Sequence, residues 1–467
     1  MKTENCDVLR VRTRWVALTV LLVANFLAVL ASTIVTVAIP SIRAGLELSD
    51  TATVWVLGAY ALCYGVVLIP GGRWGDLAGR KRVFLVGLAG FCLGGLIAAT
   101  APQGWVMIAG AAIQGCAAGL TVPQVLGSIP ALFAPEERGR AFGLYGVATG
   151  LGAAVGPLAG GLLLAWDPAG LAWRSVFGVL VVLGLAALVI GWRVLPASPK
   201  RPGTIDALGT ALLALALVLL LVPLTLSQHD GWSAASITAA IASGPALALF
   251  AWRQHTRQVH RQEPLLRLTL LRHRGFTAAL LVGLCYFAAF QGMLFVAATS
   301  LQAGSHLTPL AAGLCLTPFA IASMVVSLQS DRITRRLGTR TIAVGAILVI
   351  VGLGTAIAVT STNTGPVALA AALVIVGLGH GLIVPPNVAF GLRDIPPALA
   401  GGAGGAINTV QRIGQSLGVA AIGGTFLASA TTNGYDRALP VALATGALAA
   451  VATLIAALVL PRSPRRP

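Results

Sequence analysis

Two ionisable side chains stand inside long apolar stretches of this 467-residue chain, at His380 and Arg412. Counting about 1.5 Å per residue along a helix places both near the middle of a bilayer. Such groups are functional candidates, because burying a charge in hydrocarbon is costly. An arginine stays charged and can hold an anionic or polarised group, or bond to backbone carbonyls. A histidine titrates near neutrality, so His380 is either a proton carrier or a hydrogen-bonded packing residue.

Uncharged polar side chains also occur at mid-depth in the apolar stretches. They either line a mostly neutral, aromatic-edged pocket or make interhelical contacts worth about 0.6 kcal/mol each. A pocket of this kind suits an amphiphilic organic molecule better than a small ion. The candidates for a substrate or proton site, besides His380 and Arg412, are Asn25, Tyr60, Tyr64, Gln114, Gln124, Tyr286, Gln291, Asn408 and Gln411.

The composition identifies the elements that carry these residues. The chain is 57% hydrophobic and only 10% charged, whereas soluble proteins are about 25% charged. This excludes a water-soluble enzyme and predicts an all-α integral membrane protein with helices of about 20 or more apolar residues. The predicted spans are 15–39, 53–71, 83–101, 105–132, 141–166, 174–195, 207–226, 233–252, 275–301, 308–329, 341–360, 366–391, 402–428 and 439–460.

The distribution of basic residues supports this count of fourteen spans. With both termini in the cytoplasm, 27 Lys and Arg lie in inside loops and three lie outside, at Arg43, Arg174 and Arg437. Cytoplasmic loops carry this excess in membrane proteins, and an error of one helix would invert every later loop. The net charge of +17 is therefore attributed to topology and not to nucleic-acid binding.

The spans group into two six-helix halves with two additional helices between them. This plan is common in transporters that bind substrate between facing halves. The predicted divisions are a cytoplasmic tail 1–14, an N-terminal half 15–195, two added helices 196–252, a cytoplasmic linker 253–274, a C-terminal half 275–460 and a basic tail 461–467.

A charged, glycine-containing loop follows the second span. Asp76 in this loop can cap a helix N-terminus and pair with arginine, at about 0.3–1 kcal/mol per contact. If those contacts exist in one conformation alone, they favour that state of a gate. Otherwise the segment is a solvated basic loop. The candidate gating residues are Gly72, Asp76, Gly79, Arg80, Lys81 and Arg82.

The fifth span carries glycines at every fourth position. Gly152, Gly156 and Gly160 share one helix face, with Pro157 and Gly161 beside them. Small residues let helices approach closely in lipid, and a proline can bend the helix. The row is either a plain packing seam or, as we expect, a seam between the two halves that opens and closes.

Together these two segments resemble motifs of the major facilitator superfamily. The run from Gly72 to Arg82 is similar to its loop motif G-x-x-x-D-x-x-G-[RK]-[RK]-[RK], and the run from Gly150 to Gly161 resembles its antiporter motif. With fourteen spans, the chain resembles the drug:proton antiporter branch. The resemblance implies a major facilitator fold and proton-driven export of drug-like or antibiotic molecules.

Two positions depart from that branch. Its members usually carry an Asp in the first span and an Arg in the fourth, where this chain has Ala31 and Ala111. Loss of one partner alone would leave an unpaired charge in the membrane, so the two losses are coupled in our interpretation. The alternative function is an uncoupled facilitator or metabolite transporter of the same fold.

Other classes fit less well. A receptor that kept the fold lacks a soluble signalling domain here, and an intramembrane enzyme lacks embedded carboxylates or a metal-ligand cluster. No motif implies a cofactor, a metal site or an ATP-binding loop. The expected partners are the lipid bilayer, an amphiphilic substrate and protons, with no nucleic acid. We expect a multi-pass monomer in the cell membrane with cytoplasmic termini.

Overall fold

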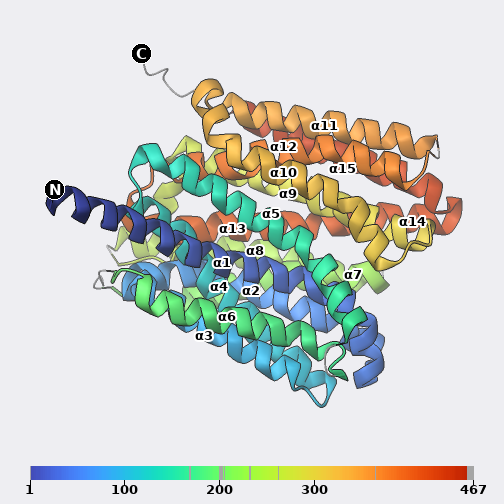
Figure 1. Cartoon of the computed structure of the whole chain (residues 1–467), viewed down its shortest axis with the longest axis horizontal. Helices are drawn as coiled ribbons and strands as arrows, with labels where there is room; N and C mark the ends of the chain where they lie inside the picture. The colour runs from blue at the N-terminus through green and yellow to red at the C-terminus, as the bar shows by residue number, and fades with distance from the viewer. Residues whose placement is uncertain are drawn as a thin grey trace.

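The fold is known from a computed structural model. It describes residues 2–167, 170–198, 203–204, 206–230, 233–260, 262–362 and 364–459. Within this part of the chain the regular elements are helices (Figure 1).

The helices follow the apolar stretches in order. In the N-terminal half and the added pair they are α1 (Lys2–Leu46), α2 (Asp50–Ala78), α3 (Arg80–Ala99), α4 (Gly104–Leu132), α5 (Pro135–Trp166), α6 (Arg174–Val194), α7 (Ala207–Asp230) and α8 (Ala234–Val259). After the short helix η2 (Leu268–Arg272), the C-terminal half contains α9 (Arg274–Thr299), η3 (Ser300–Gly304), α10 (Pro309–Leu337), α11 (Arg340–Ser361), α12 (Pro366–Leu392), η4 (Pro397–Leu399), α13 (Ala400–Gly418), η5 (Val419–Gly423), α14 (Gly424–Asn433) and α15 (Tyr435–Leu458).

Fourteen of the helical segments in the described chain are long and apolar enough to cross a membrane, which confirms the predicted number. The thirteenth span is continuous through α13, η5 and α14. Two boundaries differ from the prediction. Helix α1 begins at Lys2, so residues 2–14 of the predicted tail extend the first helix. The predicted gating loop is mostly helical, since only Gly79, with φ of 94°, separates α2 from α3.

The helices pack as two bundles that lie side by side (Figure 1). In the first bundle α2 and α3 pack on α4, while α1 packs on α5 and α6. In the second, α10 and α11 pack on α12, and α9 packs on α13 and α15. The pairs α5–α10 and α2–α13 join the two bundles, and α7 packs on α2 and α8. Side chains on α2, α5, α10 and α13 therefore lie at the contact between the halves, where relative motion of the halves changes their surroundings.

The interiors of the two bundles are apolar. One core cluster is centred on Tyr286, Phe290 and Phe319 of the C-terminal half, and another includes Trp173 and Phe177 of the N-terminal half. Close helix contacts depend on small residues, because lipid provides no hydrophobic drive for helix association.

Candidate functional site

The end of α2 makes a charged contact with the opposite half. Asp76 is buried, and its Oδ2 accepts the N–H of Gly402, in the first turn of α13, at 3.1 Å. Its Oδ1 accepts a hydrogen bond from Nη2 of Arg80 at 2.9 Å. Arg80 also donates to the carbonyls of Gly127 in α4 and Pro397 in η4. Because a helix N-terminus favours negative charge, the carboxylate stabilises the start of α13 from the other bundle.

Glycines bring α2 and α13 into backbone contact beside this charge. A Cβ atom added at Gly72 would lie 2.2 Å from the carbonyl oxygen of Gly401. A Cβ atom added at Gly405 would lie 2.4 Å from the carbonyl oxygen of Leu68. These separations leave no room for a side chain, so the two helices are closed against each other at this end.

The other predicted gating residues stay within the N-terminal half. Lys81 donates through Nζ to the carbonyl of Leu195, at the end of α6, at 2.6 Å. Arg82 is exposed. Of the predicted set, Gly72, Asp76 and Arg80 are therefore the residues that contact the C-terminal half.

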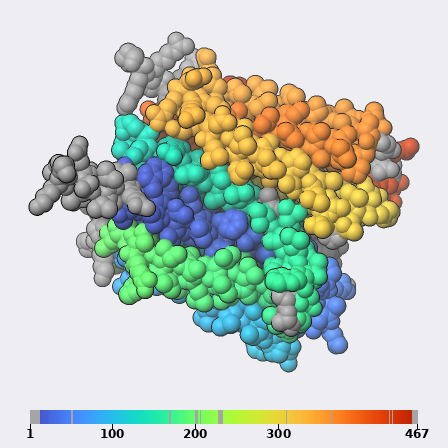
Figure 2. All heavy atoms as spheres, viewed as in Figure 1, coloured from blue at the N-terminus to red at the C-terminus, as the bar shows by residue number. Residues whose placement is uncertain are grey.

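A second contact between the halves joins α5 to α10. Figure 2 shows α5 between α1 and α10 on one face of the molecule. A Cβ atom added at Gly143 would lie 2.8 Å from the carbonyl oxygen of Ser327. Arg335 donates to the carbonyl of Glu136 and pairs with Asp331 at 3.1 Å. Both inter-half contacts thus lie at the end of the bundle that was predicted to be cytoplasmic.

The predicted glycine seam lies elsewhere than expected. A Cβ atom added at Gly156 would lie 2.0 Å from Oγ1 of Thr33 in α1, and Gly152 and Gly160 also face α1. This seam is inside the N-terminal half, so the prediction that it separates the two halves is wrong. The helix period explains the error, because spacing shows which residues share a face and not which neighbour meets that face. The glycines of α5 that face α10 and α12 are Gly139, Gly143, Gly146 and Gly150.

Pro157 and Gly161, the other two residues of that motif, differ in their surroundings. The side chain of Pro157 lies 3.8 Å from a Cβ atom added at Gly313, which places it towards α10. No described atom would lie within 4 Å of a Cβ atom added at Gly161. These two positions are therefore not part of the tight α1–α5 contact.

Several polar residues meet where α2, α5 and α13 approach each other. The guanidinium of Arg412 lies 4.3 Å from the ring centroid of Tyr64, and the Tyr64 ring lies 6.0 Å from that of Tyr60. Tyr145 donates through its hydroxyl to Oδ1 of Asn408 at 3.4 Å, across the two halves. Tyr145 was not predicted from the sequence, although it is the tyrosine of the glycine-rich fifth span. This group can bind a polar or charged part of a substrate.

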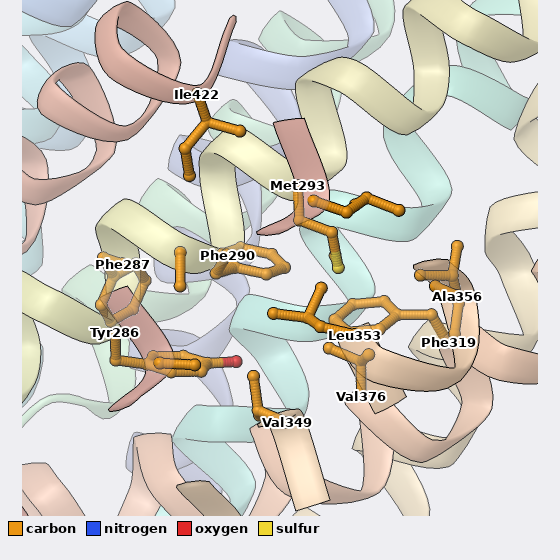
Figure 3. Close-up of a cluster of buried hydrophobic side chains, with 14 of the residues drawn as sticks. Tyr286, Phe287, Phe290, Met293, Phe319, Val349, Leu353, Ala356, Val376 and Ile422 are labelled. Atoms are coloured by element: carbon orange, nitrogen blue, oxygen red, sulfur yellow. The ribbon is translucent and has the colours of Figure 1, made fainter. Parts of the chain in front are cut away.

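His380 and Tyr286 form a separate pair inside the C-terminal half. The Tyr286 hydroxyl and Nδ1 of His380 are 2.5 Å apart, and both residues are buried. The rings of Phe290 and Phe319 lie 4.8 Å and 5.5 Å from the His380 ring. Figure 3 shows Tyr286 and these phenylalanines gathered in the apolar cluster. This geometry fits the interpretation of His380 as a hydrogen-bonded packing residue.

The remaining candidates are distributed over separate helix contacts. Gln411 is buried and lies near the α9 backbone, whereas Gln291 is partly exposed. The hydrogen bonds of the others join helices of the N-terminal half: Asn25 to Thr149 at 3.0 Å, Tyr60 to the Ala28 carbonyl at 2.6 Å, Gln114 to the Phe91 carbonyl at 3.4 Å and Gln124 to the Gly71 carbonyl at 2.8 Å.

A polar cluster that sequence reasoning missed attaches the added helices. Asp206 accepts hydrogen bonds from Nη2 of Arg253 at 2.8 Å, from Nε2 of Gln254 at 3.0 Å and from the Gly209 N–H at 3.0 Å. Gln254 in turn accepts the N–H of Leu265 at 2.7 Å. Burial raises the pKa of the Asp206 carboxyl, but these hydrogen bonds outweigh it and the net pKa lies below its ordinary value. The cluster therefore fixes α8 and the linker to the start of α7.

Comparisons with known proteins agree with this architecture. A sequence profile described as Major Facilitator Superfamily matches residues 21–419. The chain is 32% identical over 424 residues to the probable actinorhodin transporter of Streptomyces coelicolor, covering 88% of this chain and 72% of that protein. It is 34% identical over 416 residues to the puromycin resistance protein pur8 of Streptomyces alboniger, covering 87% of this chain and 80% of that protein.

A solved structure supports the fold. The human organic anion transporter MFSD10 superimposes with a TM-score of 0.66 at 16% identity, covering 94% of this chain and 99% of that chain. At that identity the likeness concerns the fold alone. The spanning helices and the relatives describe a multi-pass membrane transporter and not an enzyme, and the chain belongs to the drug-efflux branch of the major facilitator superfamily.

Proposed function

We propose that the protein exports drug-like or antibiotic molecules across the cell membrane by alternating access, driven by the proton gradient. The observation that carries this proposal is the kinship with an actinorhodin transporter and a puromycin resistance protein. The termini face the cytoplasm in this proposal, since the basic loops lie on that side. The working unit is a monomer in the bilayer.

The inter-half contacts support the alternating-access part of the proposal. Asp76 and Arg80 contact the α13 region at one end of the bundle, and Arg335 contacts α5 at the same end. These hydrogen bonds and ion pairs lie at one end of the bundle, so they can break while the opposite end closes. Substrate released from a site between the halves would then leave on the other side of the membrane.

Uncoupled facilitation is the second candidate function, and one observation favours it. Ala31 and Ala111 stand where the related antiporters carry an Asp and an Arg, and both alanines are buried in the N-terminal core. A proton carrier at this point is therefore replaced by apolar packing.

Everted membrane vesicles separate the two functions. The vesicles are given an acid interior, read with a pH-sensitive dye, and challenged with antibiotics and lipophilic cations one at a time. A protein-dependent release of protons on substrate addition supports the exchanger. Labelled compound that crosses without proton movement supports the facilitator. If neither signal is observed, the result contradicts drug transport.

A further inference from the structure

A small cavity lies where α2, α7 and α13 meet, towards the end of the bundle away from the α2–α3 turn. Its lining includes Trp55 and Leu62 of α2, Leu226 of α7, and Arg412 and Gln415 of α13. The cavity has a volume of about 50 Å³. That is room for a small polar group and not for a whole drug molecule.

Arg412 is the charged residue of this cavity, and its described partners are neutral. Nη1 donates to Oε1 of Gln415 at 2.9 Å, and the guanidinium lies over the ring of Tyr64. Among the ion pairs of the described residues, none joins Arg412 to a carboxylate. A guanidinium has five N–H donors, so Arg412 retains donors for a ligand while Tyr64 and Gln415 orient it.

The depth of Arg412 determines which charge can neutralise it. The residue lies about 18 Å along the helix from the start of α13, close to the middle of the hydrocarbon region. Electrostatic interactions are strong there, because the effective dielectric constant is low. A phosphate at the headgroup level does not reach this depth. The complementary negative charge therefore has to come with a molecule that enters between the halves.

We propose that this cavity binds the carboxylate of an amphiphilic organic acid. The acid group enters the cavity and pairs with Arg412. The adjoining part of the apolar body contacts Trp55, Leu62 and Leu226 of the cavity wall, and the rest of the molecule lies outside the cavity. The inference rests on the proposed export function and specifies its substrate class, organic anions in preference to organic cations. The site is shared by both halves and α7, so relative motion of the halves alters its shape.

A matched pair of probes tests the charge preference. The full-length protein in phosphatidylcholine nanodiscs is titrated at pH 7.5 with anthraquinone-2-carboxylate and with its neutral primary amide. Quenching of tryptophan fluorescence reports binding, and Trp55 lies in the cavity wall. We expect the acid to bind about tenfold or more tightly than the amide, as a hydrogen-bonded charge predicts.

Three variants assign that preference to the cavity. Arg412→Gln is expected to remove the acid preference and leave amide binding unchanged. Arg437→Gln removes the same charge from an exposed position, and it is expected to retain the preference. Gly58→Leu introduces a side chain into the cavity wall, and it is expected to weaken the binding of both probes. Thermal unfolding of each variant verifies that it is folded.

Four outcomes overturn the inference: no saturable binding of the acid, equal affinity for acid and amide, an acid preference that survives Arg412→Gln, or competition by added phosphatidylglycerol, which would make a lipid the occupant. If a variant does not fold, the comparison of the two probes on the unsubstituted protein still decides. The binding measurement needs no transport. Flux in vesicles without an acid preference therefore contradicts this inference alone, whereas absence of flux contradicts the proposed function.

Discussion

The carboxylate of Asp76 in α2 accepts the backbone N–H of Gly402 in α13, so a side chain of one half caps a helix of the other. The same carboxylate pairs with Arg80, which reaches the carbonyl of Pro397 beside that helix. The contact can exist only while this end of the bundle is closed. The free energy of this contact therefore stabilises the conformation closed at this end relative to the open one.

Asp76→Asn is expected to favour opening at this end. The amide cannot form the ion pair with Arg80, and loss of about 1–2 kcal/mol changes the population ratio about 5–30-fold. Spin labels at the exposed positions Arg82 and Arg336 should then report longer distances. Glu47→Gln neutralises an exposed carboxylate outside the contact and should leave the distances unchanged. An unaltered distribution in Asp76→Asn would contradict the gating role.

Gly72→Ala is expected to separate α2 from α13. The added Cβ atom would lie 2.2 Å from the carbonyl oxygen of Gly401, and backbone has to move to relieve that contact. The same pair of spin labels should show a lengthened distance, together with reduced flux in vesicles. Gly178→Ala is the matched control, because no described atom would lie within 4 Å of its Cβ atom. Equal behaviour of the two variants would count against closure by α2 and α13.

Gly156→Ala is expected to lower the thermal stability of the N-terminal half. Its Cβ atom would lie 2.0 Å from Oγ1 of Thr33, and such overpacking costs about 1–3 kcal/mol. Gly161→Ala lies on the same helix in open space and should change stability little. The unfolding midpoint of both variants, measured in one detergent, checks the difference. Equal midpoints would show that α1 and α5 are not tightly packed at Gly156.

Acid is expected to weaken the attachment of α7 and α8 through Asp206. Since the folded-state pKa of this carboxyl lies below its ordinary value of 3.8, its ionised form stabilises the fold. That stability is present above about pH 3.8 and is lost as the pH falls through the folded-state pKa. The Asp206→Asn variant should have a free energy of unfolding about 2 kcal/mol lower at neutral pH. Its further loss of stability in acid should be smaller than that of the original chain.

Unfolding midpoints between pH 7 and pH 3 measure this effect. Glu136→Gln serves as the control, because that side chain is exposed. An Asp206→Asn protein with the stability and acid response of the original chain would refute the assignment.

His380 is expected to act on stability and not on proton movement. Its ring lies against Phe290 and Phe319 and is hydrogen-bonded to Tyr286, and the residue is only 3% exposed. His380→Leu and Tyr286→Phe should each cost about 1–3 kcal/mol, because each leaves a buried polar partner unsatisfied. The double variant should cost less than the sum. Loss of proton release in vesicles by stable His380→Leu protein would instead identify His380 as the carrier.

The sequence by itself determined the number of spans. Twenty apolar residues can cross a bilayer only as a helix, and the distribution of basic residues among the loops supports the count of spans. It also indicated Asp76 as a capping residue, because a helix N-terminus stabilises a nearby carboxylate. These properties depend on local composition, which a single chain displays directly.

Tertiary structure alone decided which neighbour each helix face meets. The period of Gly152, Gly156 and Gly160 identifies a shared face, but only packing shows that this face meets α1 and not the other half. The pairing of Tyr145 with Asn408 and the stacking of Arg412 on Tyr64 join residues more than 200 positions apart. Spacing along the chain carries no information on contacts of that range, because they depend on how whole helices pack.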